Sequence, residues 1–378
     1  RQRANRGNRR ASDIMSAPRT TNRTTAFAIT LIIAVLSALL FTLIHMPIPW
    51  LLGPMIGVCA AAKIVKSYTF YWPGFVRNAG LIIVGYALGI AFTQDTLTEI
   101  ARQLPAMVLM TSLLLLLCGL IAYGVSKATG ISYATALTGS IPGGLSQMVT
   151  VAEETKGIDL TVVTFLQVSR LMMIVVFIPI IVYSPWLDLA GSGSSTTAAV
   201  AETIASPRSW SGLWPSIILY GVVCTGLSLL ANKINFPTAF LLPPLIAAAA
   251  LHLGGVTAPE LPSPILAAAQ LMIGCYVGLL LKPENLPNKP KLITVAVLSG
   301  IVLIAGACGL SYLLTRLHSM TAATSLLSLS PGGMDQMGII AHEISANVSI
   351  VSCYQLFRTF FIFLAVPPLL RVLFRRLR

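Results

Sequence analysis

Residues 142–148 read Pro-Gly-Gly-Leu-Ser-Gln-Met, and residues 331–337 read Pro-Gly-Gly-Met-Asp-Gln-Met. The two prolines are 331 − 142 = 189 positions apart, which is half of a chain of 378 residues. Each stretch is followed by an Ala-Glu-Glu or Ala-His-Glu sequence and then by a Gln-x-x-Arg sequence, at residues 167–170 and 355–358. A pattern that recurs at half the chain length indicates an internal tandem duplication.

The composition is that of a membrane protein. Hydrophobic residues make up 56% of the chain, charged residues only 10%, and the mean hydropathy is +0.83. A soluble domain carries about 25% charged residues. Many apolar runs reach roughly the 17–25 residues that a helix needs to cross a bilayer. We therefore predict an all-α polytopic membrane protein.

The formal net charge of +13 is concentrated at the two ends of the chain and in short loops. This follows the positive-inside rule and predicts a membrane protein with both ends in the cytoplasm. No helix-turn-helix or zinc-finger spacing is present, so we expect no nucleic-acid partner. The six cysteines form no CxxC pair and the four histidines do not cluster, so we expect neither a metal nor a cofactor.

The chain divides into five predicted regions. They are a disordered basic tail (1–25), a first membrane repeat (26–184), a flexible linker (185–211), a second membrane repeat (212–372) and a basic C-terminal segment (373–378). The linker contains a Gly-Ser-Gly-Ser-Ser-Thr-Thr run, which is typical of flexible connections.

Each repeat is predicted to hold about five spans and one Pro-Gly-Gly element. A polar loop is expected at 93–103, and the spans at about 26–44, 47–62, 79–92, 104–123 and 160–183, then 213–230, 241–253, 265–281, 293–314 and 349–370. Within them, Gly85-x-x-x-Gly89 and Gly274-x-x-x-Gly278 predict close helix packing.

The number of spans decides the orientation of the two repeats. Five spans place the linker outside and give inverted repeats, a design found in secondary transporters. If each Pro-Gly-Gly element is instead a crossing, broken helix, each half has six spans and the repeats are parallel. The low positive charge of the linker favours the inverted arrangement.

The Pro-Gly-Gly elements predict helix breaks at membrane depth. Proline removes a backbone donor, and the freed backbone groups need partners, so such a break persists only inside protein or beside a cavity. The helix that follows would present its N-terminus to an anion. Ser146 and Gln147 in one copy, and Asp335 and Gln336 in the other, fall in its first turn. Helix capping is the alternative role for these four side chains.

Four titratable residues lie about two turns further on. They are Glu153 and Glu154 in the first copy, and His342 and Glu343 in the second. A buried carboxylate can take up a proton or hold a cation. The alternative is a solvated carboxylate at the mouth of a hairpin.

Arg170 and Arg358 lie about ten residues inside the last span of each half, too deep for easy snorkelling. Each should face the protein interior, and bind either an anionic substrate or the carbonyls exposed at the break. Gln167 and Gln355 lie one turn earlier on the same helix face. The predicted substrate- or ion-binding residues are thus Pro142, Gly143, Gly144, Gln147, Glu153, Glu154, Gln167, Arg170, Pro331, Gly332, Gly333, Asp335, Gln336, His342, Glu343, Gln355 and Arg358.

Taken together, these motifs resemble the membrane AbrB family, the duplicated inner-membrane proteins of Gram-negative bacteria, over residues 26–372. The resemblance rests on residues 51–55, 140–144, 167–170, 329–333 and 355–358. The family carries two labels, a regulator of gene expression and an ammonia monooxygenase. The residues include no DNA-binding domain and no ligand cluster for copper or iron, so we expect no enzyme.

The architecture also resembles, by analogy, carboxylate symporters built from two inverted five-span halves. We therefore expect a secondary transporter of a small anionic or zwitterionic metabolite, with proton or cation coupling. A membrane-embedded regulator acting through a partner protein is the alternative, and a membrane enzyme ranks third. The lipid bilayer is the expected surrounding, and homo-oligomer formation is left open.

Overall fold

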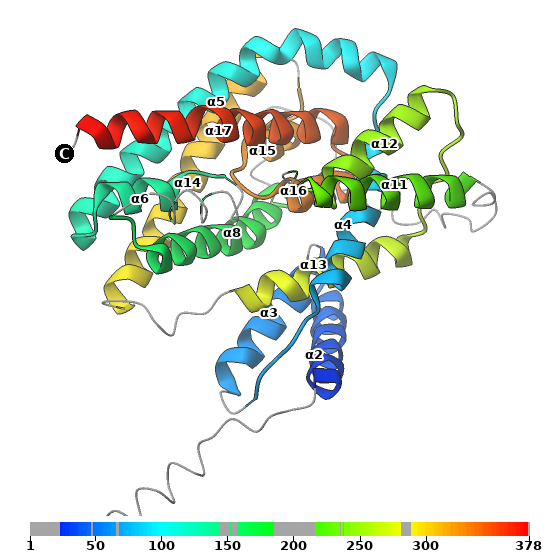
Figure 1. Cartoon of the computed structure of the whole chain (residues 1–378), viewed down its shortest axis with the longest axis horizontal. Coiled ribbons are helices and arrows are strands. Elements are labelled where there is room, and N and C mark those ends of the chain that lie inside the picture. Colours follow the sequence, from blue (N-terminus) through cyan, green and yellow to red (C-terminus); the bar gives the residue numbers. More distant parts are fainter. Residues whose placement is uncertain are drawn as a thin grey trace, which may run out of the picture. The chain divides into compact units, whose positions relative to one another are not determined.

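The computed structural model describes residues 23–46, 48–65, 68–143, 148, 152, 157–184, 216–234, 236, 238–280, 289–318 and 320–376. In this part of the chain all regular structure is helical, as predicted (Figure 1). The helices are α2 (Arg23–Leu43), α3 (Pro49–Ile64), α4 (Gly74–Gly89), α5 (Gln94–Thr129), α6 (Tyr133–Ser140), α8 (Leu160–Val182), α11 (Ser216–Lys233), α12 (Leu242–Leu253), α13 (Ser263–Leu280), α14 (Lys289–Leu317), α15 (Ala322–Leu329), α16 (Met334–Glu343) and α17 (Val348–Arg376). The predicted linker at 185–211 and most of the predicted tail at 1–25 lie outside the described residues.

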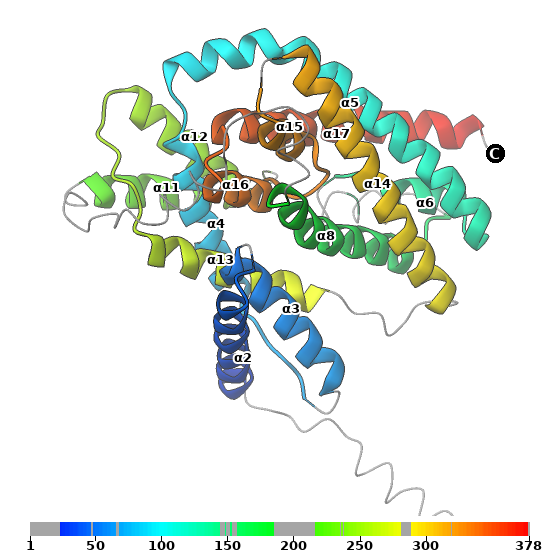
Figure 2. The same cartoon turned by 180° about the vertical axis from the view of Figure 1, so that it is seen from behind.

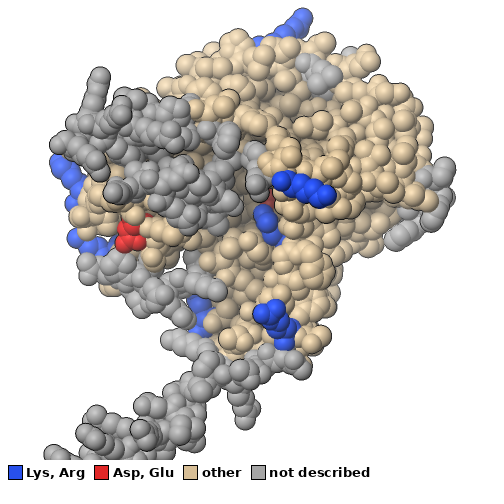
Figure 3. Space-filling view, viewed as in Figure 1, with Lys and Arg blue, Asp and Glu red and all other residues tan. Residues whose placement is uncertain are grey.

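Six of the described helices are long and apolar enough to cross a bilayer by length and composition: α2, α5, α8, α11, α13 and α14. Four further apolar stretches are shorter, at 49–64, 74–89, 242–253 and 348–362. Large apolar side chains on the apolar helices are exposed on the surface of the protein. Leu116 and Leu120 of α5, for example, are each 64% exposed. The face drawn in Figure 3 correspondingly carries few charged side chains. These features fit a multi-pass membrane protein.

One predicted element is wrong. The polar loop expected at 93–103 is helical, because α5 begins at Gln94 and continues unbroken to Thr129. Two of its polar side chains form a hydrogen bond at helical spacing, because Gln103 Nε2 donates to Glu99 Oε1, one turn earlier, at 3.3 Å. Polar residues at an i, i+4 spacing support a helix as well as they suit a loop.

The chain forms two compact units. Unit 1 comprises residues 1–77 and 270–280, and unit 2 comprises residues 78–269 and 281–378, so the boundary falls within α4 and α13. In unit 1, α2 packs along α3, where the backbone of Gly53 lies against Ala38. The same unit buries Trp72, whose indole N–H donates to the Met272 carbonyl at 3.0 Å.

In unit 2, α5 and α14 lie side by side in both views (Figures 1 and 2). The short helix α6 packs between α5 and α8, and the short helix α15 packs between α14 and α17. In addition, α8 contacts α14, and α17 contacts α5. In the two predicted repeats, α5, α6 and α8 correspond to α14, α15 and α17. The contacts made by the first three helices are therefore repeated by the second three.

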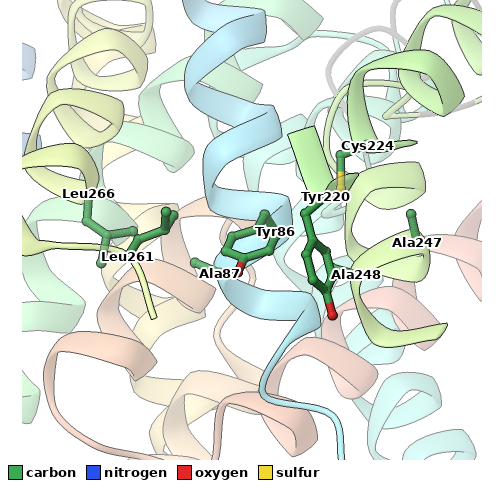
Figure 4. Close-up of a cluster of buried hydrophobic side chains, with 8 residues drawn as sticks. All are labelled: Tyr86, Ala87, Tyr220, Cys224, Ala247, Ala248, Leu261 and Leu266. Carbon is green, nitrogen blue, oxygen red and sulfur yellow. The ribbon is translucent and has the colours of Figure 1, made fainter. Parts of the chain in front are cut away.

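A second part of unit 2 centres on two tyrosines, shown in Figure 4. The rings of Tyr86 in α4 and Tyr220 in α11 meet edge to face, with centroids 5.1 Å apart. Their hydroxyls donate to the carbonyls of Pro259 and Val256. The two side chains therefore fasten α4, α11 and the segment before α13 to one another.

The GxxxG glycines do pack closely, as predicted. Each pair of glycines contacts backbone from the opposite half of the sequence. In unit 1, Gly274 and Gly278 of α13 lie against the carbonyl oxygens of Leu51 and Met55 in α3. A side chain on either glycine would begin 2.5 Å from that oxygen. In unit 2, Gly85 and Gly89 of α4 lie in the same way against the carbonyls of Leu241 and Leu245.

Candidate functional site

The first break follows the short helix α6. Ser132 caps the start of α6, because its hydroxyl accepts a hydrogen bond from the Thr135 N–H. The helix ends at Ser140, and its C-cap residue Ile141 has the extended conformation (ψ 130°) that the following Pro142 imposes. The end of α6 therefore leaves backbone carbonyls without helical partners.

Two side chains of α8 satisfy these carbonyls. Gln167 Nε2 donates to the Thr138 and Ile141 carbonyls at 2.8 and 2.9 Å. Arg170 Nη1 donates to the Ser140 and Ile141 carbonyls at 3.2 and 2.9 Å, and its Nη2 donates to Gln167 Oε1 at 2.7 Å. The Gln-x-x-Arg sequence is thus a side-chain clamp on the C-terminus of a neighbouring helix.

The second break has the same construction. Thr321 caps α15, and Ser330 before Pro331 is extended (ψ 125°). Gln355 Nε2 donates to the carbonyls of Leu327 and Ser330 at 2.7 and 3.0 Å. Arg358 donates to the carbonyls of Ser330 and Gly332, each at 2.8 Å, and also to Gln355 Oε1. The contact of each arginine with the carbonyls of a break, one of the two predicted alternatives, is therefore present in both copies.

The correspondence extends to the loops around each clamp. Gly143 and Gly332 lie under the side chains of Met148 and Met337, which are also 189 positions apart (337 − 148). Farther along, the offset is 188 positions for the arginines (358 − 170). The one-residue difference is absorbed before the turns at Gly157 and Ser345, where both backbones have positive φ, 91° and 54°.

The sequence reasoning missed two pairs of residues that hold each clamp helix at its start. Thr135 Oγ1 accepts from the Asp159 N–H at 3.1 Å, and Thr324 Oγ1 accepts from the Asn347 N–H at 3.3 Å. Asp159 then caps α8 with its carboxylate, and Asn347 bonds the Ile350 N–H with its amide oxygen. The repeated Ser/Thr-x-x-Thr sequence at 132–135 and 321–324 could have identified the threonines.

The two arginines are close enough to act on each other electrostatically. Each guanidinium repels the other, and the Cys118 thiol of α5 lies within the field of both. Arg170 is 8% exposed, Arg358 is 3% exposed and Cys118 is fully buried. The Nε atoms of both arginines are buried without a hydrogen-bond partner. Arg170, Arg358 and Cys118 are called the arginine pair site below.

In the second copy, the predicted residues after the break lie on α16. Gly333 is the N-cap, Asp335 and Gln336 lie in the first turn, and His342 and Glu343 lie in the last turn. The Asp335 carboxylate accepts a hydrogen bond through Oδ2 from Gln336 Nε2 at 2.8 Å. Glu343 interacts electrostatically with Tyr183 at the end of α8. In the first copy, Gly144, Gln147, Glu153 and Glu154 lie outside the described residues.

Two buried cations beside two helix breaks, within apolar helices, define a polytopic membrane protein with a polar centre. Comparison with known proteins places the chain in a family. Residues 50–374 match the model described as "Transition state regulatory protein AbrB", so the chain belongs to the AbrB family.

Two relatives resemble the chain over most of its length. It is 28% identical over 347 residues to "Putative regulator AbrB" of Escherichia coli (strain K12), covering 90% of this chain and 94% of the relative. It is 26% identical over 353 residues to "Uncharacterized protein YhjN" of Bacillus subtilis (strain 168), covering 88% and 89% respectively. The family resemblance expected from the motifs is confirmed.

Proposed function

We propose that this chain is a secondary transporter of a small anionic or zwitterionic metabolite, which binds at the arginine pair site. The observation that carries the proposal is the pair itself: two buried guanidinium groups that repel each other, each with an unpartnered Nε. Transport, and not catalysis, is the activity that such a pair within apolar helices favours.

The electrostatic balance of the site supports an anion. Burying one charge costs several kcal/mol after relaxation, and a second like charge nearby adds to that cost. The carbonyl ends of α6 and α15 offset part of it, because a helix C-terminus carries about −0.5 elementary charge. An anion between the two arginines would offset the remainder.

The hydrogen-bond donors also leave room for a ligand. A guanidinium has five N–H donors. The oxygens bonded to Arg170 are those of Ser140, Ile141 and Gln167, and those bonded to Arg358 are those of Ser330, Gly332 and Gln355. The Nε–H of each arginine therefore remains for a carboxylate or phosphate oxygen.

Burial of the site supports alternating access. A solute reaches buried Nε atoms only after the surrounding helices separate, and the two helix breaks are the places where such a movement costs least. We place the two repeats in inverted orientation, as the loop charges favour, with both chain ends in the cytoplasm of a bacterium and the protein in its inner membrane. Glu153, Glu154, His342 and Glu343 are then the candidates for proton coupling.

The alternative is a membrane-embedded regulator of gene expression that acts through a partner. It is supported by the description of the matched family and by the name of the Escherichia coli relative. The two functions differ in one requirement, because a transporter moves its solute without any other protein.

The test is uptake by the purified chain in sealed vesicles. A panel of labelled small carboxylates, phosphorylated metabolites and amino acids is presented to vesicles that contain the parent protein, Arg170→Lys or Arg358→Lys. Lysine keeps the charge but loses the planar fork. We expect uptake of one chemical class by the parent and a loss of at least about tenfold in each variant.

Thermal melting in detergent separates binding from folding. A ligand that binds only the folded chain raises the melting midpoint. A shift in the parent that disappears in both lysine variants supports the arginine pair site. No uptake and no shift across the panel, with both variants merely less stable, would overturn transport and favour the regulator.

A further inference from the structure

The described part of unit 1 carries positive charge and no carboxylate side chain. Residues 1–77 and 270–280, which form the unit, contain one acidic residue, Asp13, and it lies outside the described residues. The sequence has no other aspartate or glutamate before Asp95. The described lysine and arginine residues of the unit are Arg23, Lys63 and Arg77. The described residues of unit 1 therefore offer these three cations no counter-charge.

Two of the cations lie at the same end of a helical hairpin. The helices α2 and α3 pack along each other and are connected by residues 44–48, so they run antiparallel (Figures 1 and 2). Arg23 is the first residue of α2, and Lys63 lies in the last turn of α3. The antiparallel arrangement places the two residues at one end of the hairpin, where both are exposed.

Both arginines lie over tyrosine rings. The guanidinium carbon of Arg77 is 4.5 Å from the ring centroid of Tyr276, and that of Arg23 is 5.9 Å from the ring centroid of Tyr71. A cation–π contact orients the guanidinium but uses none of its N–H donors. These donors match the oxygens of a phosphate group, to which arginine binds through two parallel hydrogen bonds.

A buried tryptophan holds the two tyrosines near each other. Trp72 follows Tyr71 in the sequence, and its ring packs against Phe27 of α2, with centroids 5.1 Å apart. Its indole N–H donates to the carbonyl of Met272, which lies one turn before Tyr276 in α13. The two arginines that lie over these tyrosines are therefore fixed within one small region of unit 1.

The surface around the cations is apolar. Next to Lys63, Ile64 is 80% exposed, and Phe75, at the start of α4, is 74% exposed. The helix α2, which begins at Arg23, is long and apolar enough to cross a bilayer. Basic and aromatic side chains at the end of a spanning helix are typical of the membrane–water interface, where phospholipid headgroups lie. The exposed apolar side chains favour a lipid over a nucleic acid or an acidic protein segment, because only a lipid supplies acyl chains to cover them.

We propose that Arg23, Lys63 and Arg77, together called the basic face, bind the headgroup of an anionic phospholipid. The phosphate oxygens would accept hydrogen bonds from the two guanidinium groups, and the ammonium group of Lys63 would add a third positive charge. The acyl chains would cover the apolar side chains beside them. This binding does not depend on the proposed transport.

The test is the affinity of the full-length protein in detergent for two lipids that carry the same fluorescent acyl chain, phosphatidylglycerol and phosphatidylcholine. We expect the parent to bind phosphatidylglycerol at least about fivefold more tightly at low salt, because each basic residue near a membrane surface contributes about that factor. Arg23→Gln and Arg77→Gln should each weaken the binding of phosphatidylglycerol about fivefold and leave phosphatidylcholine unchanged.

Arg316→Gln is the matched control. The Arg316 guanidinium also lies over a tyrosine ring, 5.2 Å from the centroid of Tyr312, but it belongs to unit 2 and donates to the hydroxyl of that tyrosine. This variant should keep the affinity of the parent for phosphatidylglycerol. An equal loss in Arg316→Gln would assign the binding to the overall charge of the protein and overturn the proposal.

Competition separates a lipid headgroup from other anions. Inorganic phosphate or a poly-glutamate peptide is added, at constant ionic strength, to the parent with labelled phosphatidylglycerol bound. We expect neither to displace the lipid. Displacement by phosphate would indicate a site for a free anion, and displacement by the peptide would indicate an acidic protein partner; either result overturns the proposal. Equal affinities of the parent for the two lipids also overturn it, and that comparison needs no variant to fold.

Discussion

Arg170 and Arg358 are 188 positions apart in the sequence (358 − 170), yet their guanidinium groups lie within each other's electrostatic field. Each closes the carbonyl end of a short helix, and each is preceded by a glutamine that holds it in place. Two equivalent clamps of unit 2 therefore lie near each other, and the proposed transport requires that a single solute contact both.

The clamp glutamines should matter more for stability than their polarity suggests. Gln355→Leu removes the donor to the carbonyls of Leu327 and Ser330 and the acceptor for Arg358. We expect a loss of roughly 2–4 kcal/mol, since several buried polar groups become unsatisfied together. The measurement is thermal or denaturant unfolding in detergent.

Gln103→Leu is the matched control for that variant. Gln103 is also buried, but its side-chain amide donates a single 3.3 Å hydrogen bond, to Glu99 in its own helix. A loss below about 1 kcal/mol is expected. Equal losses in the two variants would contradict the clamp.

The GxxxG glycines should tolerate no side chain. Gly274→Ala would place a methyl group 2.5 Å from the Leu51 carbonyl oxygen, and Gly85→Ala would place one 2.6 Å from that of Leu241. Each should destabilise the protein by about 1–3 kcal/mol, because the packed backbones must separate. Gly221→Ala and Gly309→Ala meet no atom within 4 Å and should be neutral or slightly stabilising. Similar unfolding midpoints for all four variants would refute this packing.

The turns at Gly157 and Ser345 both have a positive φ, but one holds glycine and the other serine. Placing glycine at 345 and serine at 157 should change stability in opposite directions. Ser345 has a left-handed backbone (φ 54°), which costs an ordinary residue roughly 1–2 kcal/mol. Ser345→Gly should therefore stabilise the protein, by up to about 1 kcal/mol once the greater freedom of glycine in the unfolded chain is included. Gly157→Ser should destabilise it, because φ there is 91°. Changes of the same sign in both variants would rule out backbone strain as the cause.

The residues that begin the two clamp helices should contribute equally. Asp159→Ala and Asn347→Ala each remove a side-chain acceptor from a helix start, at a cost of about 0.5–2 kcal/mol. Thr164→Ala, which loses only a bond to Leu160 within α8, should change stability by less than about 0.5 kcal/mol. The prediction fails in chemical unfolding if Thr164→Ala costs as much as the other two.

Cys118 should report access to the arginine pair site. In a variant that retains only this cysteine, a maleimide should react slowly, because the thiol is fully buried. A variant that retains only the half-buried Cys308 should react faster with the same membrane-permeant reagent. Addition of a transported anion should change the Cys118 rate several-fold and leave the Cys308 rate unchanged. Fast labelling of Cys118 without ligand would contradict the burial of the site.

The sequence predicted the helical class and the helix breaks, and it offered the carbonyl contacts as one of two alternatives for the arginines, because each follows from local chemistry. An X-Pro sequence forces an extended residue, and an arginine deep in an apolar helix needs acceptors. The assignment of the seventeen residues to substrate or ion binding stays a prediction, as do the inverted repeats and the domain boundaries.

Other features could not be predicted from the sequence. GxxxG spacing indicates a close contact but not its partner, so the pairing of α13 with α3 and of α4 with α12 required coordinates. The polar residues at 94–103 were equally compatible with a loop. The nearness of Cys118 to both arginines depends on the packing of α5 against helices far away in the sequence, such as α14 and α17. A local sequence pattern does not predict such packing.

The exchange of glycine contacts between the halves has a consequence for splitting the chain. A fragment that ends within residues 185–211 contains Gly85 and Gly89 but not Leu241 and Leu245, while the remaining fragment contains Gly274 and Gly278 but not Leu51 and Met55. Each fragment thus carries grooves that only the other can fill. Two such fragments made in the same cell should assemble by complementation, and an unduplicated ancestor of this chain would have had to form a homodimer to bury the same grooves.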